Sequence, residues 1–149
     1  IIRRVDGQME LIAGERRWRA SKMVGLETVP VIERPSSDRE VLEMALIENL
    51  QRQDLNAIEE AEGYVRLAKD FGLKQDIIAK RVGKSRASVA NSMRLLDLQP
   101  SIQRHLADGH LTVGHAKAIL GIKDPKDQIV VSDQILRQNM TVRSAEKFV

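Results

Sequence analysis

The chain has 149 residues, of which 42% are hydrophobic and 30% charged, as is typical of a globular protein with one domain or two small ones. It contains no cysteine, which excludes disulfide bonds and cysteine-ligated zinc, and no apolar run approaches the roughly 20 residues of a membrane span. Its first residue is Ile1, and its last, Val149, lies inside an apparent helix. We therefore expect a piece of a longer protein.

The first part of the chain predicts a small α/β unit in which strands and helices alternate. Asp6-Gly7 is typical of the turn of a β-hairpin. Pro35 breaks the last strand, and Ser37 or Asp38 can cap the helix that follows. The expected elements are strands at 1–5 and 9–13, a helix at 15–24, a strand at 28–33 and a helix at 39–49.

From residue 57 onward the pattern is helical. We place the domain boundary between residues 56 and 57, which gives domains at 1–56 and 57–149, and we expect an α+β fold that is mostly helical. Trp18 and Tyr64 lie in amphipathic helices and are expected in the core. The expected helices of the second domain are at 57–71, 74–82, 86–96, 101–107, 113–120, 124–137 and 142–149.

A glycine and three arginines stand where the first helix begins. The segment 14–19, with the sequence GERRWR, follows the apolar residues 11–13. A glycine lets the backbone approach a ligand closely, and the first turn of a helix offers unpaired N–H groups to an anion. Arginine side chains match phosphate oxygens. The pattern predicts a phosphate-binding corner, with an ordinary charged helix start as the equal alternative.

A second polar group ends the helix predicted at 39–49. Glu48 and Asn49 have side-chain oxygens that can hold Mg²⁺ beside phosphates. Arg52 can contact a phosphate or form a local salt bridge. Taken alone, Glu48 and Asn49 are more typical of a solvated polar surface than of a metal site.

The positive charge of the chain is concentrated in one segment. The net charge is only +3, but residues 72–96 hold six basic side chains and one acidic side chain, Asp76. A basic segment of this kind is the electrostatic signature of nucleic-acid binding. Only 3% of the residues are aromatic, which argues against stacking on single strands and favours a duplex that is read by a helix.

Residues 75–96 predict a helix-turn-helix, which places its second helix in the major groove of DNA. Gly83 provides the turn, and Ser85 can cap the second helix. Arg86 and Asn91 have donors and acceptors suited to base edges. The other candidates for DNA contacts are Lys80, Lys84, Ser85, Ser88 and Arg94, of which the lysines suit phosphates. A plain helical hairpin with a solvated basic face is the alternative.

Four stretches of the sequence resemble the ParB family of chromosome- and plasmid-partition proteins. The family patterns are GERRxRA at 14–20, ENxQRxDLNxxEEA at 48–61, GKSRSxVANxxRLL at 83–96 and GxLxxGHARAL, whose first ten positions align with 109–118. The resemblance extends from Met9 to Val149. This chain departs from the family in having Ala87 where a serine is frequent.

The resemblance implies a sulfiredoxin-like N-terminal domain that binds CTP and Mg²⁺, followed by a helix-turn-helix domain that binds centromere-like parS DNA. In the family, CTP and parS close a clamp that slides along DNA, and slow CTP hydrolysis helps it to reopen. The resemblance implies Glu48 and Glu15 as catalytic residues, Glu48 and Asn49 as metal ligands, and His115 as one more DNA contact. The implied CTP-binding set is Gly14, Glu15, Arg16, Arg17, Arg19, Glu48, Asn49 and Arg52.

The same resemblance implies a cytoplasmic homodimer on the bacterial nucleoid, without membrane contact. A ParA-type ATPase and an SMC condensin are implied partners of the full-length protein. The family's cytosine-reading segment lies upstream of Ile1, and its dimerisation domain lies beyond Val149. Two alternatives stay open: a nucleoid-occlusion factor or plasmid or transcription regulator that binds another DNA site, and a repressor whose α/β part is only structural. The paired GERR and ENLQR motifs favour a nucleotide site over the last of these.

Overall fold

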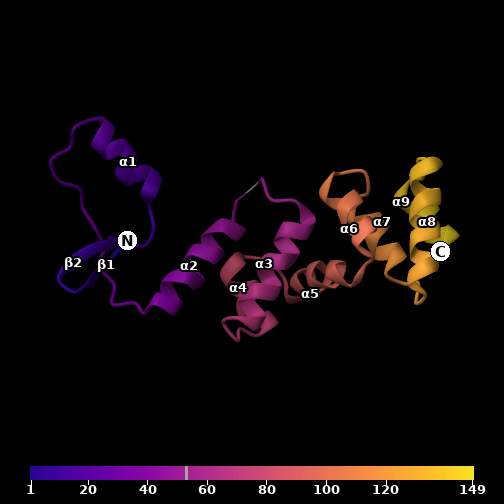
Figure 1. The fold of residues 1–149 in the computed structure, drawn as a ribbon, viewed down its shortest axis with the longest axis horizontal. Coiled ribbons are helices and arrows are strands. Elements are labelled where there is room, and N and C mark those ends of the chain that lie inside the picture. Colours follow the sequence, from indigo (N-terminus) through magenta and orange to yellow (C-terminus); the bar gives the residue numbers. More distant parts are fainter. Residues whose placement is uncertain (53) are drawn as a thin grey trace. The chain divides into compact units, whose positions relative to one another are not determined.

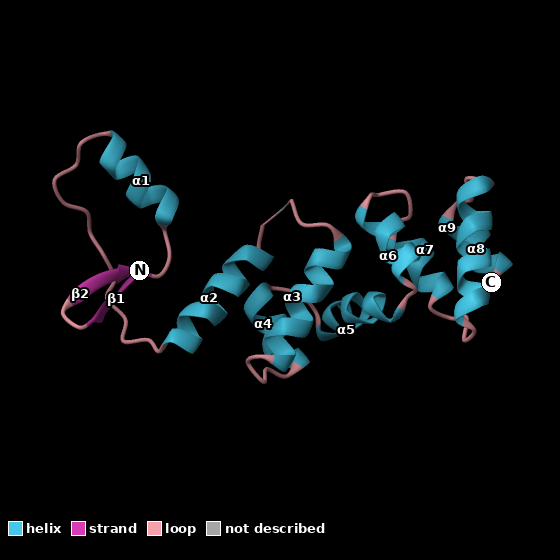
Figure 2. Ribbon diagram, in the orientation of Figure 1, coloured by secondary structure: helices cyan, strands magenta, loops and turns pink. Residues whose placement is uncertain are grey.

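The computed structural model describes residues 1–52 and 54–149. The backbone contacts divide the chain into two compact units, Ile1–Asn49 and Leu50–Val149. Figure 1 shows the elements in chain order, and Figure 2 distinguishes helices from strands and loops. Among the described residues, no helix has both the length and the apolar character that a membrane crossing requires.

The first unit is built on an antiparallel β-hairpin, which confirms the predicted one. Ile2 pairs with Leu11 at its open end. Asp6 and Gly7 form the turn with positive φ angles of 48° and 78°, as a type I′ turn requires. The elements of this part of the chain are β1 (Ile2–Val5), β2 (Gln8–Leu11), α1 (Glu15–Met23) and α2 (Asp38–Leu50).

The strand predicted at 28–33 does not form, so that prediction is wrong. A single parallel bridge between Ile2 and Glu33 links this segment to β1. Two backbone hydrogen bonds of 2.9 Å flank the bridge. Pro30 lies within the segment and Pro35 follows it, and neither has the N–H group that a longer ladder would need.

Helix α2 begins with a capping box formed by Ser37 and Glu40. The Ser37 hydroxyl accepts a hydrogen bond of 3.3 Å from the backbone N–H of Glu40. The Glu40 carboxylate in turn accepts one of 2.8 Å from the backbone N–H of Ser37. Of the two predicted caps, Ser37 therefore fills the position, and Asp38 is left to contact the hairpin.

The described residues of the second unit form helices joined by short connections. Every helix predicted after residue 56 is confirmed, and the ends differ by at most two residues. The helices are α3 (Ala57–Lys69), α4 (Gln75–Val82), α5 (Arg86–Arg94) with the 3-10 turn η1 (Leu95–Asp97), α6 (Pro100–Ala107), α7 (Val113–Ile119), α8 (Pro125–Arg137) and α9 (Val142–Phe148). The predicted mostly helical α+β fold is thereby confirmed.

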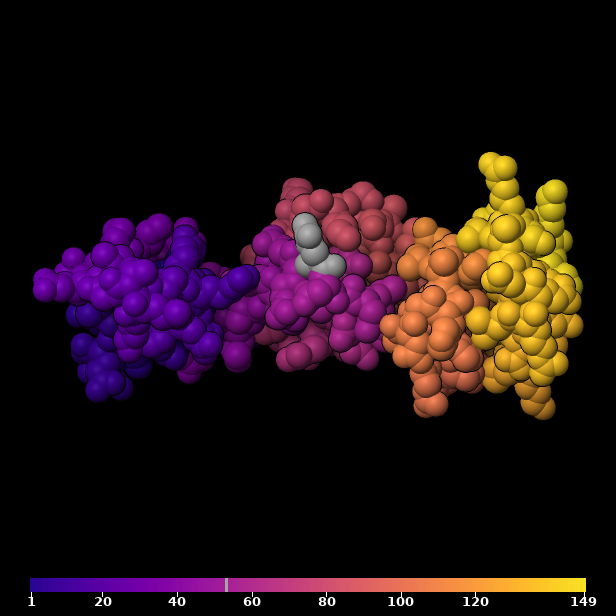
Figure 3. All heavy atoms as spheres, turned by 90° about the horizontal axis from the view of Figure 1, so that it is seen from above, coloured from indigo at the N-terminus to yellow at the C-terminus, as the bar shows by residue number. Residues whose placement is uncertain are grey.

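The core of the second unit lies between α3 and the helices that follow it. Tyr64 and Leu67 of α3 are almost fully buried, which confirms the core position predicted for Tyr64. In Figure 3 the atoms of α6 to α9, drawn from orange to yellow, form a continuous mass. The buried cluster consists of Ile58, Leu95, Leu98, Ile102, Leu106, Leu111, Ala116, Ile119, Ile135 and Ala145.

The two compact units meet between Asn49 and Leu50, a few residues before the boundary placed from sequence. Leu50 is the one fully buried residue of α2. It packs against Gly63 of α3 so closely that a Cβ atom on that glycine would lie 2.4 Å from a methyl carbon of Leu50. This contact makes the last residue of α2 part of the helical unit.

We expect Gly63→Ala to lower the free energy of unfolding by about 1–3 kcal/mol, because its methyl group would overlap the Leu50 side chain. At an open helix position the same change raises stability by about 0.5–1 kcal/mol. Urea unfolding followed by circular dichroism measures the difference.

The control is the same substitution in a Leu50→Ala background. Without the Leu50 side chain there is room for the methyl group, so Gly63→Ala should then be neutral or stabilising. An equal loss of stability in both backgrounds would contradict this account of the glycine.

Candidate functional site

The chain turns from the hairpin into α1 at Gly14, which has a φ of 98°. Gly14 is the N-cap of α1 and has no side chain to satisfy the first N–H groups of the helix. The first helical hydrogen bond runs from the Trp18 N–H to the Gly14 carbonyl, at 3.0 Å. The N–H groups of residues 15–17 therefore have no acceptor within the helix and suit an anion.

The three arginines after Gly14 have different surroundings. The Arg17 guanidinium folds back over the glycine, with a nitrogen 3.5 Å from where a Cβ of residue 14 would stand. Arg19 forms an ion pair with Glu15 one turn earlier. Arg16 is exposed. Arg17 is thus the arginine that the fold places at the uncapped helix start.

A cavity of about 590 Å³ opens beside this corner, and Gly14, Arg17 and Trp18 form part of its lining. Its volume is within the range of small-molecule sites. The rest of the lining is largely apolar and comes from Ile1, Ile2, Met9, Leu11, Ala13, Ser21, Thr28, Val29, Pro30, Val31 and Ile32. An apolar cavity with a cationic corner suits a ligand that has both a flat ring and an anionic group.

Trp18 does not lie in the core, so that prediction is wrong. Its side chain is 43% exposed. The Lys22 ammonium lies 4.3 Å from the centre of its ring, in a cation–π contact. The helix is amphipathic, but its less polar face borders the cavity rather than a packed interior.

Glu48 and Asn49 lie in the last turn of α2, and both are exposed. Figure 1 shows this end of α2 well away from α1, so the structure does not bring the two predicted halves of the nucleotide site together. Arg52 forms an ion pair of 2.6 Å with Asp54. Of the two contacts predicted for Arg52, a phosphate or a local salt bridge, the structure shows the salt bridge.

The side-chain oxygens of Glu48 and Asn49 suit an Mg²⁺ ion that is also bound by nucleotide phosphates better than an ion held by protein ligands alone. No three His, Asp or Glu side chains cluster as metal ligands within the part of the chain that the structure describes. Mg²⁺ in nucleotide sites usually takes one or two protein oxygens and completes its shell with phosphates and water.

The predicted helix-turn-helix is formed by α4 and α5. Gly83 joins the two helices with a φ of 70°, and the Ser85 hydroxyl caps α5 by accepting a 3.1 Å hydrogen bond from the N–H of Ser88. Val89 is fully buried and seats α5 against α3 and α4. The predicted DNA-contacting side chains that remain exposed are Lys80, Lys84, Ser85, Arg86, Ser88, Asn91 and Arg94.

Lys84, at the turn, is held by Glu60 of α3. Its ammonium lies 2.8 Å from the Glu60 carboxylate, which also accepts a hydrogen bond from the Tyr64 hydroxyl. Burial alone raises the pKa of Glu60, but the hydrogen bonds from Lys84 and Tyr64 outweigh it, so the net pKa is lowered. Glu60 is therefore charged at neutral pH and competes with any phosphate for Lys84.

His115 is placed differently from the other predicted DNA contacts, because its side chain is only 9% exposed. Its Nδ1 lies 3.3 Å from the backbone N–H of Thr112 in a capping box at the start of α7. Its Nε2 lies 3.1 Å from the Met140 carbonyl. Both ring nitrogens therefore have partners within the protein, and the geometry supports a structural role in place of the expected DNA contact.

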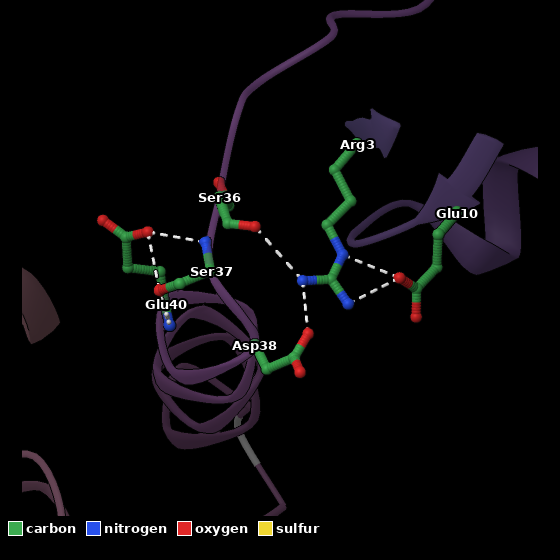
Figure 4. A network of polar contacts seen from close by, with 6 residues as sticks. All are labelled: Arg3, Glu10, Ser36, Ser37, Asp38 and Glu40. Carbon is green, nitrogen blue, oxygen red and sulfur yellow. Dashed lines mark hydrogen bonds and ion pairs between the residues drawn. The ribbon is translucent and has the colours of Figure 1, made fainter. Parts of the chain in front are cut away.

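Sequence reasoning did not single out Arg3 or Glu60. Arg3 is buried between the hairpin and the start of α2 (Figure 4). Arg3 is a charged residue within an apolar run that favours a strand, and this feature could have indicated a buried ion pair. Glu60 lies within one of the recognised motifs, but the sequence alone does not pair it with Lys84.

Comparison with protein families decides the classification. The ParB HTH domain model matches residues 53–149, and the ParB N-terminal domain model matches residues 1–50. The chain belongs to the ParB family. Both halves of this ParB-family chain are thus accounted for, the hairpin unit by one model and the helical unit by the other.

The names of curated relatives agree with the assignment to the ParB family. The probable chromosome-partitioning protein ParB of Coxiella burnetii is 46% identical over 149 residues, which are 100% of this chain and 51% of that protein. The chain spans about half the length of the curated relatives it matches.

Solved structures of the Caulobacter crescentus ParB, truncated at its C-terminus, are also similar. The complex with the centromeric parS site is 44% identical and has a TM-score of 0.89, covering 99% of this chain and 79% of that one. The complex with CTP-gamma-S is 46% identical and has a TM-score of 0.46, covering 91% of this chain and 75% of that one.

Proposed function

We propose that this chain binds CTP through its first unit and parS-like duplex DNA through its second, and that the whole protein segregates chromosomes or plasmids. The observation that carries the proposal is the corner at Gly14, where an uncapped helix start and Arg17 meet an apolar cavity. A structural domain has no need for such a corner. The choice of CTP follows from the family resemblance.

In the proposed complex, the N–H groups at the start of α1 and the guanidinium of Arg17 hold the triphosphate. Arg16 and Arg19 add positive charge around it, and Gly14 leaves space for its oxygens. Glu48 and Asn49 hold Mg²⁺, which neutralises phosphate charge when bound. This chemistry rests on positioning and electrostatics, and needs no covalent nucleophile.

Hydrolysis is the finer part of the proposal. Glu48 is the residue proposed to orient the attacking water and accept its proton, and Glu15 is proposed to affect hydrolysis or the clamp cycle through its ion pair with Arg19. Figure 1 shows the C-terminal end of α2, which carries Glu48, away from α1, so α2 has to move before Glu48 and the Gly14 corner contribute to one site. A slow reaction and a clamp that closes with nucleotide are consistent with that requirement.

In the proposed DNA complex, α5 enters the major groove. Arg86 and Asn91 contact base edges, while Lys80 and Lys84 contact phosphates. We further propose, from the family resemblance, a cytoplasmic homodimer on the nucleoid. A ParA-type ATPase and an SMC condensin are the proposed partners of the whole protein.

The test is CTP binding and hydrolysis by the full-length protein, with and without a parS duplex, and with ATP, GTP and UTP as controls. CTP-selective turnover that parS stimulates is the expected result. Specific DNA binding without any effect of nucleotide would leave a helix-turn-helix regulator with a structural first unit.

We expect Arg17→Ala to abolish CTP binding and leave DNA affinity unchanged, because Arg17 is the arginine at the uncapped helix start. The emission of Trp18, the single tryptophan, reports binding from the cavity wall. Arg34→Ala is the control for the loss of one positive charge. Equal loss of CTP and DNA binding in Arg17→Ala would indicate misfolding or a wrongly assigned site.

We expect Arg86→Ala to weaken parS binding by roughly 1–3 kcal/mol and to relax specificity at one position, as for an arginine that reads a base. Fluorescence anisotropy with parS and scrambled duplexes measures both effects. An unchanged affinity for parS would rule out base reading by this side chain.

We expect Glu60→Gln to raise DNA affinity by roughly two- to five-fold, because releasing Lys84 makes its ammonium available to a phosphate. Glu62→Gln, on the same helix, removes the same charge and is the matched control. The same rise in both variants would show that net charge, rather than release of Lys84, determines the affinity.

A further inference from the structure

Arg3 is a buried arginine at the meeting point of three segments. Its side chain is only 10% exposed. Figure 4 shows it between Glu10 of β2 on one side and Ser36 and Asp38, at the start of α2, on the other. Loss of its partners would leave a buried charge unpaired, which is costly.

The contacts of Arg3 use all three nitrogens of its guanidinium. Nε and Nη2 lie 2.7 and 2.6 Å from one oxygen of the Glu10 carboxylate. Nη1 lies 3.1 Å from the backbone carbonyl of Ser36 and 2.6 Å from the Asp38 carboxylate. The side chain therefore fastens the first turn of α2 to both strands of the hairpin.

The far end of α2 depends on how its first turn is held. Glu48 and Asn49 lie ten and eleven positions after Asp38, about 15–17 Å along the helix axis. Over that length a rotation of 10° at Asp38 moves them by about 3 Å. Displacements of about 1 Å are enough to cost a hundred-fold in rate at a reacting centre.

We propose that Arg3 is a positioning residue that holds the Asp38 end of α2 on the hairpin, so that a swing of α2 about this end brings Glu48 and Asn49 to the Gly14 corner. This role rests on the proposed nucleotide site. Arg3 itself touches neither nucleotide nor metal. It acts through Asp38 and the Ser36 carbonyl.

The neighbouring Arg4 provides a matched comparison. Consecutive strand residues face opposite sides of a sheet, and Arg4 pairs with Glu33 at 3.1 Å on the exposed side. Its side chain and that of Glu33 are 53% and 47% exposed. This pair has the same chemistry and lies in the same strand, but it does not contact α2.

The experiment measures the angle of α2 by the distance between two spin labels. The chain has no cysteine, so Ala20→Cys on α1 and Ala45→Cys on α2, both exposed, label the full chain without background. The variants are Asp38→Asn, Asp38→Glu and, as the control, Glu33→Gln. Asp38 is chosen over Arg3 because its side chain is 87% exposed and Arg3 keeps its ion pair with Glu10 when Asp38 is replaced.

Without nucleotide, we expect one narrow distance distribution in the unmodified chain and in Glu33→Gln. Asp38→Asn should broaden it by several ångströms, and Asp38→Glu, which keeps the charge, should restore it. An unchanged distribution in Asp38→Asn would overturn the proposal. This measurement uses no CTP, so it tests the positioning role of Arg3 even if the proposed nucleotide site is wrong.

With CTP, we expect the distance to shorten in the unmodified chain. In Asp38→Asn, CTP affinity should stay within about three-fold, because the Gly14 corner is intact, while hydrolysis falls by at least about ten-fold. A loss of affinity equal to the loss of hydrolysis would overturn the positioning role. The absence of CTP binding in the unmodified chain would instead refute the proposed function.

Discussion

The positive φ of Gly14 is the constraint on which the rest of the first unit depends. Any other residue would be strained at 98°, and a side-chain cap such as Ser or Asp would satisfy the N–H groups that the helix now leaves open. In the second unit, α3, α5, α7, α8 and α9 begin with a residue whose side chain caps the helix, whereas α4 and α6 do not. At α1 the chain instead places Arg17 over an uncapped start, so the first turn is prepared for an anion that the protein itself does not supply.

Two ion pairs with buried or half-buried members connect the functional segments to the scaffold. Arg3 fastens α2 to the hairpin, and Glu60 holds Lys84 at the turn before α5. A charge is costly to bury without a partner, and an ion pair between fully exposed side chains adds little stability. A partly buried pair avoids the first cost and is screened less by solvent than an exposed pair. Both pairs therefore define where a segment lies more than they add to stability.

The two units use opposite strategies for their apolar surface. The helical unit buries a cluster of apolar side chains from α3 and the segments after α5, and buried Val89 packs α5 against α3 and α4. The first unit leaves Met23, Val24, Leu26 and Ile32 largely exposed, and Ile32 also lines the cavity. Exposed apolar patches of this kind usually mark a ligand or partner surface.

The sequence by itself determined the helices of the second unit with their helix-turn-helix, the hairpin, and the start of α1 at Gly14. These features depend on local periodicity, turn residues and caps. The sequence did not determine the segment at 28–33, since a strand needs a partner with free N–H and C=O groups, and prolines limit that pairing. Only the tertiary structure decided that Trp18 lines a cavity, that His115 is held by Met140 and that Lys84 is held by Glu60. These outcomes depend on contacts between residues far apart in the chain, which no local pattern records.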